Sequence, residues 1–443
     1  MIAAVLLATT VTAAAGGAAT GAATTRATPC PGWGRPAIAA DPRPGALRVF
    51  AIQFAQRPAA MVTAADYRRA IACAMTTEVV PHLARGRPDL VVFDGGYAPA
   101  LRYVESRFPA LSGQLGRSFV AATDTFVRVF MTTMAQVARR YRVYVIASNT
   151  QAPFALTRDR AAVAALAGPG SGGETAVYAP TAGAAYDQTF LWGPRVVRRH
   201  APAPLANLLA DNRKVPLTAF EQELGFATGP TGGAAARRNL RPVAIPGTGA
   251  RLGIATSLPA FRYGPAGGDP CADVTVTYMR CLNRLGANVV IQADANDGPW
   301  TGTDGAERWQ PLSWMGSAWR AVSDPSVGFT YAVNPFMVGN LADTPFDGQS
   351  AILQRGRRGP GCHYVGNGGV VAGDDIPADR GYAGAKPQFL AIAPWVAPDG
   401  PRSRLRRRDA ALARTGGYVQ TALVADLPFP ADRSRRGCVE AGR

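Results

Sequence analysis

Residues 285–292 read Leu-Gly-Ala-Asn-Val-Val-Ile-Gln, and this short apolar run follows residues 273–285, whose pattern predicts a helix. The Gly-Ala pair is typical of a helix end, and the β-branched residues after it predict a strand over 288–292. A strand that follows a helix after so short a turn is typical of a layered α/β domain. We therefore expect strands and helices to alternate on both sides of this run.

The alternation does extend outward in both directions. Short apolar or β-branched runs predict strands at 47–54, 89–93, 143–147, 189–192, 251–256, 328–333, 350–354 and 419–424. Longer amphipathic stretches predict helices at 64–84, 119–141 and 309–323. No internal repeat with a period of about 20–50 residues is visible. The pattern predicts one large α/β domain.

The bulk composition limits the classes of protein. The chain has 443 residues, of which 47% are hydrophobic and 17% charged, with a formal net charge of +17. That balance is typical of a folded core, and the high positive charge attracts anionic partners. However, the arginines are spread along the chain apart from clusters at 402–408 and 433–436, and no nucleic-acid-binding motif accompanies them. We expect a solvated basic surface and no specific nucleic-acid partner.

The N-terminal residues indicate export. Residues 1–25 form a short apolar run followed by small residues, which resembles a secretory leader, although no positive residue precedes the run. The run is shorter than the roughly 20 apolar residues that span a bilayer, and no later segment predicts a transmembrane helix. We expect a secreted or cell-envelope protein. Its predicted parts are a leader at 1–28, a linker at 29–45, a main domain at 46–356 and a basic C-terminal extension at 357–443.

The cysteine pattern fits an exported chain. An even count of six cysteines allows up to three disulfides, whose pairing the sequence leaves open. They are Cys30, Cys73, Cys271, Cys281, Cys362 and Cys438. No zinc-ligand spacing, dinucleotide fingerprint, Walker A motif or Gly-x-Ser-x-Gly motif occurs, and the three histidines are scattered. We therefore predict no metal and no cofactor.

One lysine stands out. Among 47 basic residues only Lys214 and Lys386 are lysine, so arginine fills almost every position that needs positive charge. A compact ammonium that is kept in such a chain indicates a site that needs to titrate or to reach a developing charge. The alternative is that Lys214 is simply a solvated residue. Its surroundings, Asn212 to Glu221, decide between the two.

A series of motifs in a fixed order resembles the carbon–nitrogen hydrolase (nitrilase/amidase) superfamily over residues 47–356. The motifs are Gln53 at the end of the first predicted strand, Pro88–Phe93, Tyr141–Ala147, Tyr186–Thr189, Arg213–Leu217, Gly253–Ser257, Gly286–Val290 and Phe346–Ile352. The resemblance implies a four-layer α-β-β-α sandwich. It also implies a catalytic set in which a glutamate is the base, a cysteine attacks an amide or nitrile carbon, and a lysine stabilises the tetrahedral intermediate.

The resemblance carries over residue by residue with two departures. Lys214 stands at the lysine position, and Glu221 or Glu223 stands near a second, supporting glutamate. At the base position Gly95 replaces the glutamate, so that Asp94, one residue earlier and one methylene shorter, is the substitute base if the loop is shifted.

The nucleophile position departs as well. Ser257 stands where the family has cysteine, and a hydroxyl is harder to activate than a thiol. A second alignment places Cys271 there instead, but Gly- and Pro-rich residues 262–270 would then separate the strand from the nucleophile. We favour a structural disulfide at Cys271.

The loop after the 288–292 strand supplies two further candidates. Asp297 and Trp300 are expected to line a substrate pocket, since relatives bind substrate there; a loop-capping carboxylate and a packed tryptophan are the alternatives. Two functions remain open. One is an enzyme that hydrolyses or transfers the acyl group of a small-molecule amide or nitrile, and the other is an inactive relative that binds or assembles. Analogy with the superfamily adds a homodimer.

Overall fold

The computed structural model describes residues 30, 32–57, 60–84, 86–95, 115–167, 173–303, 310–341, 344–356, 389–395, 402–434 and 438–441. Every element below belongs to one compact unit, Gly32–Arg443. The leader expected at 1–28 lies outside the described residues. None of the helices in the described ranges is long and apolar enough to cross a bilayer.

The first sheet has the strand order β1-β19-β2-β4-β5-β8-β9. Its strands are β1 (Ala37–Ala39), β19 (Thr421–Leu427), β2 (Leu47–Gln53), β4 (Asp89–Gly95), β5 (Tyr144–Gln151), β8 (Tyr186–Trp192) and β9 (Leu208–Arg213). The three central strands β2, β4 and β5 run parallel. They are followed by β8 and β9, each antiparallel to its predecessor. The carboxyl ends of β2, β4, β5 and β9 therefore lie at one edge of the sheet.

The second sheet repeats this arrangement in the order β10-β11-β12-β14-β17-β18-β20. Its strands are β10 (Val243–Ala244), β11 (Arg251–Ile254), β12 (Val289–Ile291), β14 (Tyr331–Asn334), β17 (Ala351–Gln354), β18 (Phe389–Ile392) and β20 (Val439–Glu440). Here β11, β12 and β14 are parallel, and β17 and β18 are the antiparallel pair. Each sheet thus contains the same run of five strands.

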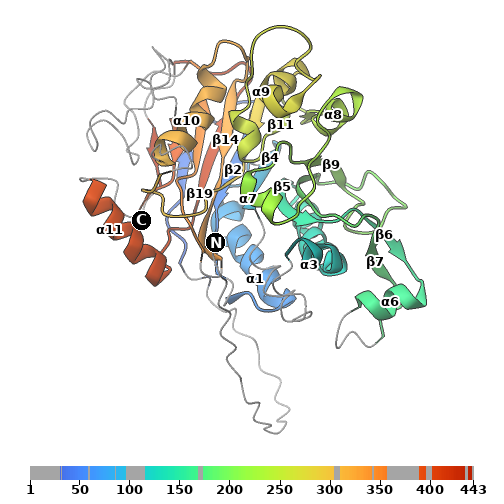
Figure 1. Ribbon diagram of the computed structural model, residues 1–443. Coiled ribbons are helices and arrows are strands. Elements are labelled where there is room, and N and C mark those ends of the chain that lie inside the picture. The colour runs from blue at the N-terminus through green and yellow to red at the C-terminus, as the bar shows by residue number, and fades with distance from the viewer. Residues whose placement is uncertain are drawn as a thin grey trace. The chain divides into compact units, whose positions relative to one another are not determined.

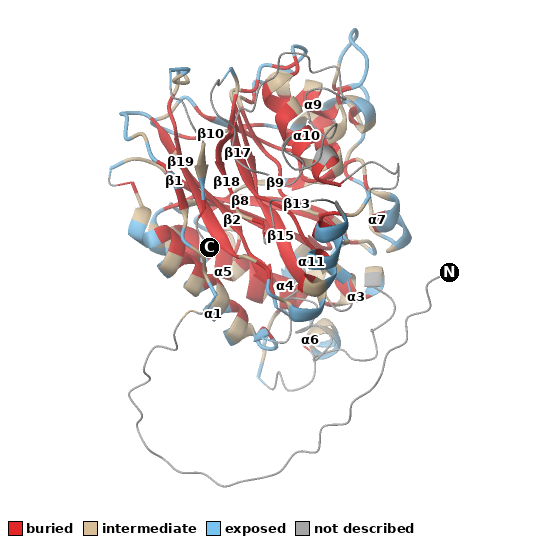
Figure 2. Cartoon of the chain, turned by 90° about the vertical axis from the view of Figure 1, so that its left-hand side faces the viewer, coloured by how far each residue is buried: buried red, intermediate tan, exposed pale blue. Residues whose placement is uncertain are grey.

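The two sheets pack face to face. One apolar cluster contains Val49 and Val92 of the first sheet together with Val289 and Val333 of the second. A second cluster lies on the outer face of the first sheet under helices α1 (Ala64–Ala74) and α5 (Thr132–Tyr141). A third lies on the outer face of the second sheet under α9 (Val274–Arg284) and α10 (Gln310–Ser323) (Figure 1). The predicted α/β class is confirmed, and helices cover the outer face of each of the two packed sheets. Figure 2 shows the buried strands between half-exposed helices.

Smaller elements complete the unit. The connections carry α3 (Leu115–Ala121), α4 (Thr123–Phe126), α6 (Arg160–Leu166), α7 (Ala219–Glu223), α8 (Gly233–Asn239), α11 (Arg402–Thr415), β3 (Ala55–Gln56), β6 (Phe154–Thr157), β7 (Val177–Pro180), β13 (Asp294–Ala295), β15 (Phe336–Leu341) and β16 (Thr344–Phe346). The helix predicted at 119–141 is divided into α3, α4 and α5, with a π-helical turn at Val127–Met131. The helix predicted at 64–84 ends in a π-helical turn and a short 3₁₀ turn, in which Pro81 has no amide hydrogen to continue the helix.

The C-terminal part does not form a separate extension. Strand β19 lies between β1 and β2, and all seven of its residues are buried. Strands β18 and β20 complete the second sheet. The predicted boundaries at 45/46 and 356/357 therefore do not separate structural units, because residues from both flanks complete the sheets. The sequence around these strands is rich in arginine and glycine, which is why a separate extension was predicted there and not strands of the two sheets.

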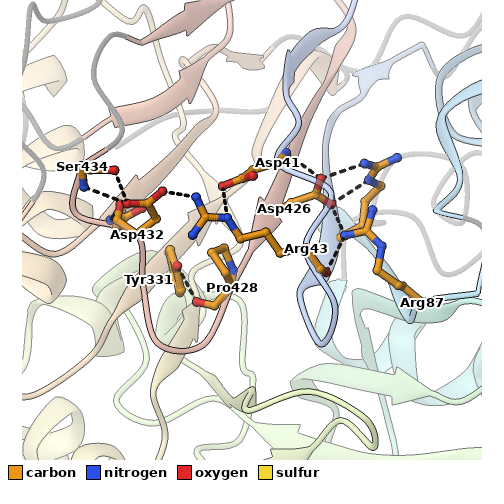
Figure 3. Close-up of polar contacts among 10 residues, drawn as sticks. Asp41, Arg43, Arg87, Tyr331, Asp426, Pro428, Asp432 and Ser434 are labelled. Atoms are coloured by element: carbon orange, nitrogen blue, oxygen red, sulfur yellow. Dashed lines mark hydrogen bonds and ion pairs between the residues drawn. The ribbon is translucent and has the colours of Figure 1, made fainter.

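Ion pairs fasten the C-terminal strand (Figure 3). Figure 3 labels Asp426 between Asp41 and Arg87. The Arg48 guanidinium donates from Nε and Nη2 to the two Asp426 carboxylate oxygens at 2.9 and 2.8 Å. Arg87 Nη1 lies 3.4 Å from Asp426 Oδ1, and the Asp41 amide donates to Oδ2 at 2.7 Å. A bidentate arginine–carboxylate pair is among the stronger polar contacts in proteins. Asp426 therefore joins β19 to the N-terminal half of the chain.

The structure contains a disulfide between Cys271 and Cys281. Cys30, Cys73 and Cys438 are also disulfide-bonded, and Cys362 lies outside the described residues. Because the Cys271 sulfur is bonded and fully buried, the disulfide expectation for this residue is confirmed. The alignment that made Cys271 a nucleophile is therefore wrong for this state of the protein.

Candidate functional site

A cavity of about 360 Å³ opens at the edge where the carboxyl ends of the parallel strands meet. Its polar lining includes side chains that lie in or beside strands of both sheets, and one from α7: Ser148, Asp187, Lys214, Glu221, Ser257 and Asp294. Ligand sites of α/β sheets are commonly found at this edge. Four of the predicted site residues line this cavity: Lys214, Glu221, Ser257 and Asp297.

Lys214 follows β9 and is held by its backbone and its side chain. Its amide donates to the Asp187 carbonyl at 2.8 Å, and its ammonium lies 3.5 Å from Asp187 Oδ2. The ammonium also donates to Glu221 Oε1, and the residue is only 4% exposed. The solvated alternative for Lys214 is therefore wrong, because the side chain is buried among carboxylates.

Glu221 is oriented by the start of a helix. Thr218 caps α7: its hydroxyl accepts from the Glu221 amide at 3.2 Å, and Glu221 Oε2 accepts from the Thr218 amide at 2.8 Å. This reciprocal pair is a capping box. It fixes one carboxylate oxygen on the backbone and leaves the other for Lys214. Glu223, the alternative supporting glutamate, is exposed and does not line the cavity.

The cluster keeps the lysine charged. Burial alone lowers the Lys214 pKa, but the charges of Glu221 and Asp187 and their hydrogen bonds outweigh it, so that the pKa lies above its ordinary value. Burial raises the Glu221 pKa, but the charge of Lys214 and its hydrogen bond lower it by more, so that the net shift is downward. At neutral pH the pair is an ammonium beside a carboxylate.

Ser257 adopts a strained backbone conformation directly after β11. Its φ of 60° and ψ of −124° lie in a region that non-glycine residues rarely occupy. Strain of this kind costs about 1–3 kcal/mol and tends to occur at functional sites. The backbone on both sides is fixed, since the Ala255 amide donates to the Ile291 carbonyl and the Ala260 amide to the Ser257 carbonyl, each at 2.9 Å. The turn holds Ser257 at the cavity wall.

Asp294 is a site residue that the sequence did not single out. It follows β12, is fully buried and lines the cavity; its Oδ2 accepts from Gln292 Nε2 at 2.8 Å and Asn334 Nδ2 at 2.9 Å. Within the described ranges its Oδ1 has no hydrogen-bond partner. Burial raises the Asp294 pKa to about 7, against the lowering effect of these two amides, Lys214 and the Ser257 amide. Such a carboxyl exchanges a proton near neutral pH.

A chain of hydroxyl groups joins the two sheets beside Ser257. Ser148 Oγ of β5 lies 2.8 Å from Thr189 Oγ1 of β8, and Thr189 Oγ1 lies 2.7 Å from Thr256 Oγ1. Each group can be donor or acceptor, so the direction of the chain is free to reverse. The contact fixes the residue before Ser257 to the first sheet. In the sequence, the only signal for this contact is the alternation of side chains between the two faces of each strand, which turns these hydroxyl groups toward the other sheet.

The other predicted site residues lie differently. Asp94 does not line the cavity: it is buried beside Phe54 and Gln56, and burial raises its pKa well above the ordinary value despite hydrogen bonds from these neighbours. Trp300 is fully buried against Phe336, with ring centroids 5.3 Å apart, and does not line the cavity either. Asp297 is exposed and does line it. Residues 96–114, which come soon after Asp94 in the chain, and residues 304–309, which come soon after Trp300, lie outside the described ranges.

Among the residues that the structure describes, no group of three or more histidine, cysteine, aspartate or glutamate side chains is arranged to hold a metal ion. The described lining of the cavity offers the hydroxyl of Ser257, the ammonium of Lys214 and several carboxyl groups. No family model matches the chain, and no curated protein matches its sequence.

Solved structures with a similar backbone do exist. A mutant of the Nesterenkonia AN1 amidase from the nitrilase superfamily is 15% identical, with 71% of this chain and 84% of that chain covered and a TM-score of 0.41. The complex of a mutant of the amidase from Nesterenkonia sp. AN1 with butyramide is 14% identical, with 70% and 84% covered and a TM-score of 0.40.

Proposed function

We propose that the protein hydrolyses or transfers the acyl group of a small amide or nitrile, with Ser257 as nucleophile. The observation that supports this most is the strained turn that holds Ser257 in the same cavity as the buried Lys214 ammonium and the Asp294 carboxyl. A nucleophile, a group that exchanges protons near neutral pH and a fixed positive charge are what acyl transfer requires. Asp294 here takes the role that the sequence gave to Asp94.

On an amide, the proposed reaction has two stages: acylation of Ser257 and release of the acyl group. Asp294, as carboxylate, takes the Ser257 hydroxyl proton while the oxygen adds to the carbonyl carbon, and the carbonyl π pair moves onto its oxygen. Lys214 stabilises that oxyanion, and Glu221 keeps Lys214 in place. Collapse breaks the C–N bond, Asp294 returns the proton to the leaving nitrogen, and a serine ester remains. Water or another nucleophile then takes the acyl group.

A second function, binding without turnover, is favoured by the base position. Gly95 stands where the superfamily has glutamate, and Asp94 does not line the cavity. A serine without an efficient base binds a substrate and does not cleave it. The two functions share the cavity and differ in whether Ser257 becomes acylated.

The test is acylation of Ser257. The protein is incubated with an activated acyl ester, and the adduct is located by peptide mass spectrometry. We expect an adduct on Ser257 that Ser257→Ala abolishes and Asp294→Asn slows at least about a hundredfold, since general-base catalysis contributes about 10²–10⁴-fold. Ser257→Cys, which restores a better nucleophile, serves as the positive control. Acylation of the Cys variant together with none of the wild type favours the binding function.

We also propose export and pairing of protomers. Disulfides are stable in oxidising compartments, which supports a secreted or envelope location. Fractionation of the native host with an antibody tests it, and a cytosolic protein with reduced Cys271 would contradict it. Light scattering after size exclusion tests the homodimer, which rests only on analogy.

A further inference from the structure

The cavity carries more negative than positive charge. Glu221 and Asp187 share the single positive charge of Lys214, and two more carboxyl groups, Asp294 and Asp297, line the same space. No arginine is among the lining residues that the structure describes, although the whole chain has a net charge of +17. The acidic character of the cavity is therefore opposite to that of the molecule. A substrate that carries positive charge is favoured at this one place.

The two additional carboxyl groups occupy different depths. Asp294 is fully buried, and its Oδ1 has no hydrogen-bond partner within the described ranges. Asp297 is exposed and has no ion pair or hydrogen bond from its side chain to the part of the chain that the structure describes. With no partner among the described residues, this carboxylate on the wall of the cavity is placed to bind a cation. Its backbone is held, because Asp297 forms a bridge with Phe346 and the Gly298 amide donates to the Pro345 carbonyl at 2.7 Å.

Aromatic rings form much of the remaining wall. Phe119, Phe226, Trp314 and Phe346 line the cavity, and Phe119 and Phe226 pack edge to face with centroids 5.4 Å apart. Aromatic faces attract cations as well as apolar chains, by about 0.5–1 kcal/mol at exposed sites and about 2 kcal/mol or more when desolvated. A carboxylate beside aromatic rings fits an ammonium group on a short hydrocarbon chain.

We propose that the substrate carries a cationic ammonium group in addition to the amide or nitrile that is cleaved. This inference rests on the proposed function for the position of the reacting group, which lies at Ser257. The ammonium binds at Asp297, and the hydrocarbon chain between them packs on the aromatic wall.

Binding of a matched set of amides tests the inference. Pentanamide, 5-aminopentanamide and 5-amino-5-oxopentanoate share a chain length and are neutral, cationic and anionic at pH 7. Calorimetry on Ser257→Ala avoids turnover. We expect the cationic amide to bind at least about tenfold more tightly than the neutral one, because it gains an ion pair and cation–π contacts. The anionic amide should bind most weakly.

Variants then locate the effect. Asp297→Asn should remove the preference for the cation and leave the affinity for pentanamide unchanged. Glu223→Gln is the matched control: it removes the same charge from an exposed position that does not line the cavity, and should preserve the preference. Equal affinity for the cationic and neutral amides, or equal loss of preference in both variants, would overturn the inference.

The two proposals fail in different ways. Turnover of pentanamide with no preference for 5-aminopentanamide contradicts the cationic substrate and leaves the proposed function standing. Tight, Asp297-dependent binding of 5-aminopentanamide without acylation of wild-type Ser257 contradicts the proposed function and leaves the cation site standing.

Discussion

The two halves of the sandwich use one strand pattern for different purposes. In the first half β2, β4 and β5 are parallel and β8 and β9 antiparallel; in the second, β11, β12 and β14 are followed by β17 and β18 in the same way. They differ where the first two parallel strands of each half end. There the first half builds contacts between the layers, and the second half builds a cavity.

The residues at these ends make the difference visible. At the end of β2, Gln53 bridges the layers: Oε1 accepts from the Ser350 amide and Nε2 donates to the Val419 carbonyl, each at 2.8 Å. After β11 the chain turns through the strained Ser257. Near the end of the second strand the first half has Asp94, which does not line the cavity, and after the second strand the second half has Asp294, which does. A similar scaffold therefore yields a site only where a side chain is turned toward open space.

The largest effect is expected at Lys214, which the first half contributes to the cavity. Lys214→Ala should abolish turnover and destabilise the protein by about 3–5 kcal/mol, because it leaves Glu221 and Asp187 buried without their cation. Lys214→Arg should restore little activity, since a planar guanidinium does not occupy the space of an ammonium. Full activity of the arginine variant would contradict the oxyanion role. Steady-state kinetics and urea denaturation measure the two quantities.

The comparison of the two buried aspartates predicts the next effect. Asp294→Asn should lower kcat/KM by about 10²–10⁴-fold, because it removes the proposed base. In the wild type, kcat/KM should rise with pH through about 7, where burial places the Asp294 pKa, and this rise should be absent from the variant.

Asp94→Asn is the control for that variant. Since Asp94 does not line the cavity, the change should leave kcat/KM within about threefold and act on stability. Burial raises the pKa of both carboxyl groups in the folded state. Each group therefore contributes less to the free energy of unfolding as the pH rises above about 4, the pKa of an aspartate in the unfolded chain. Both variants should therefore gain stability relative to the wild type as pH increases. A large activity loss in Asp94→Asn would reverse the assignment.

A smaller effect concerns a difference between the sheets. Beside β2 the first sheet has the seven-residue β19, where the second sheet has the two-residue β10 beside β11. Asp426→Asn should destabilise the protein by about 2–4 kcal/mol, because Arg48 and Arg87 lose their carboxylate. Burial raises the Asp426 pKa, but the hydrogen bonds and charge of Arg48 lower it by more, so that the net shift is downward. The wild-type contribution is therefore present above about pH 4 and is lost as pH falls below it. Urea denaturation should give a smaller difference in the free energy of unfolding between the wild type and Asp426→Asn at pH 3 than at pH 7.

The smallest effect on stability is expected at Ser257. Ser257→Gly should raise stability by about 1 kcal/mol, because glycine adopts the positive φ without strain, and should abolish turnover. Ser257→Ala keeps the strain and should be no more stable than the wild type. If the two variants have equal melting temperatures, the turn is not strained.

Much of the fold could be predicted from the sequence. β12 is a continuous apolar run and β2 contains one from Val49 to Ile52, and Gly286 and Ala287 marked the turn before β12. The three-residue β1, which reads Ala-Ile-Ala, and the two-residue β10 carry too little pattern, and β19 was expected near its place in the chain but not inside the first sheet.

Less of the site could be predicted. The Lys214 motif placed Lys214 and Glu221, since both lie in one short segment whose capping box orders them. Asp294 was missed, because its position depends on Gln292 and Asn334, which come from different strands or strand ends and meet only in three dimensions. The pKa of a carboxyl depends on such contacts, and no linear spacing encodes them.

The place of β19 has a consequence for how the molecule is made. Residues 47–53 leave the ribosome long before residues 421–427, yet the two segments pair along their whole length. Until the last part arrives, one backbone edge of β2 has no partner strand, and an open edge invites pairing with other chains. Contacts so distant in sequence also form slowly. Chains that end before residue 421 should therefore aggregate more than the full chain, because this edge of β2 stays open.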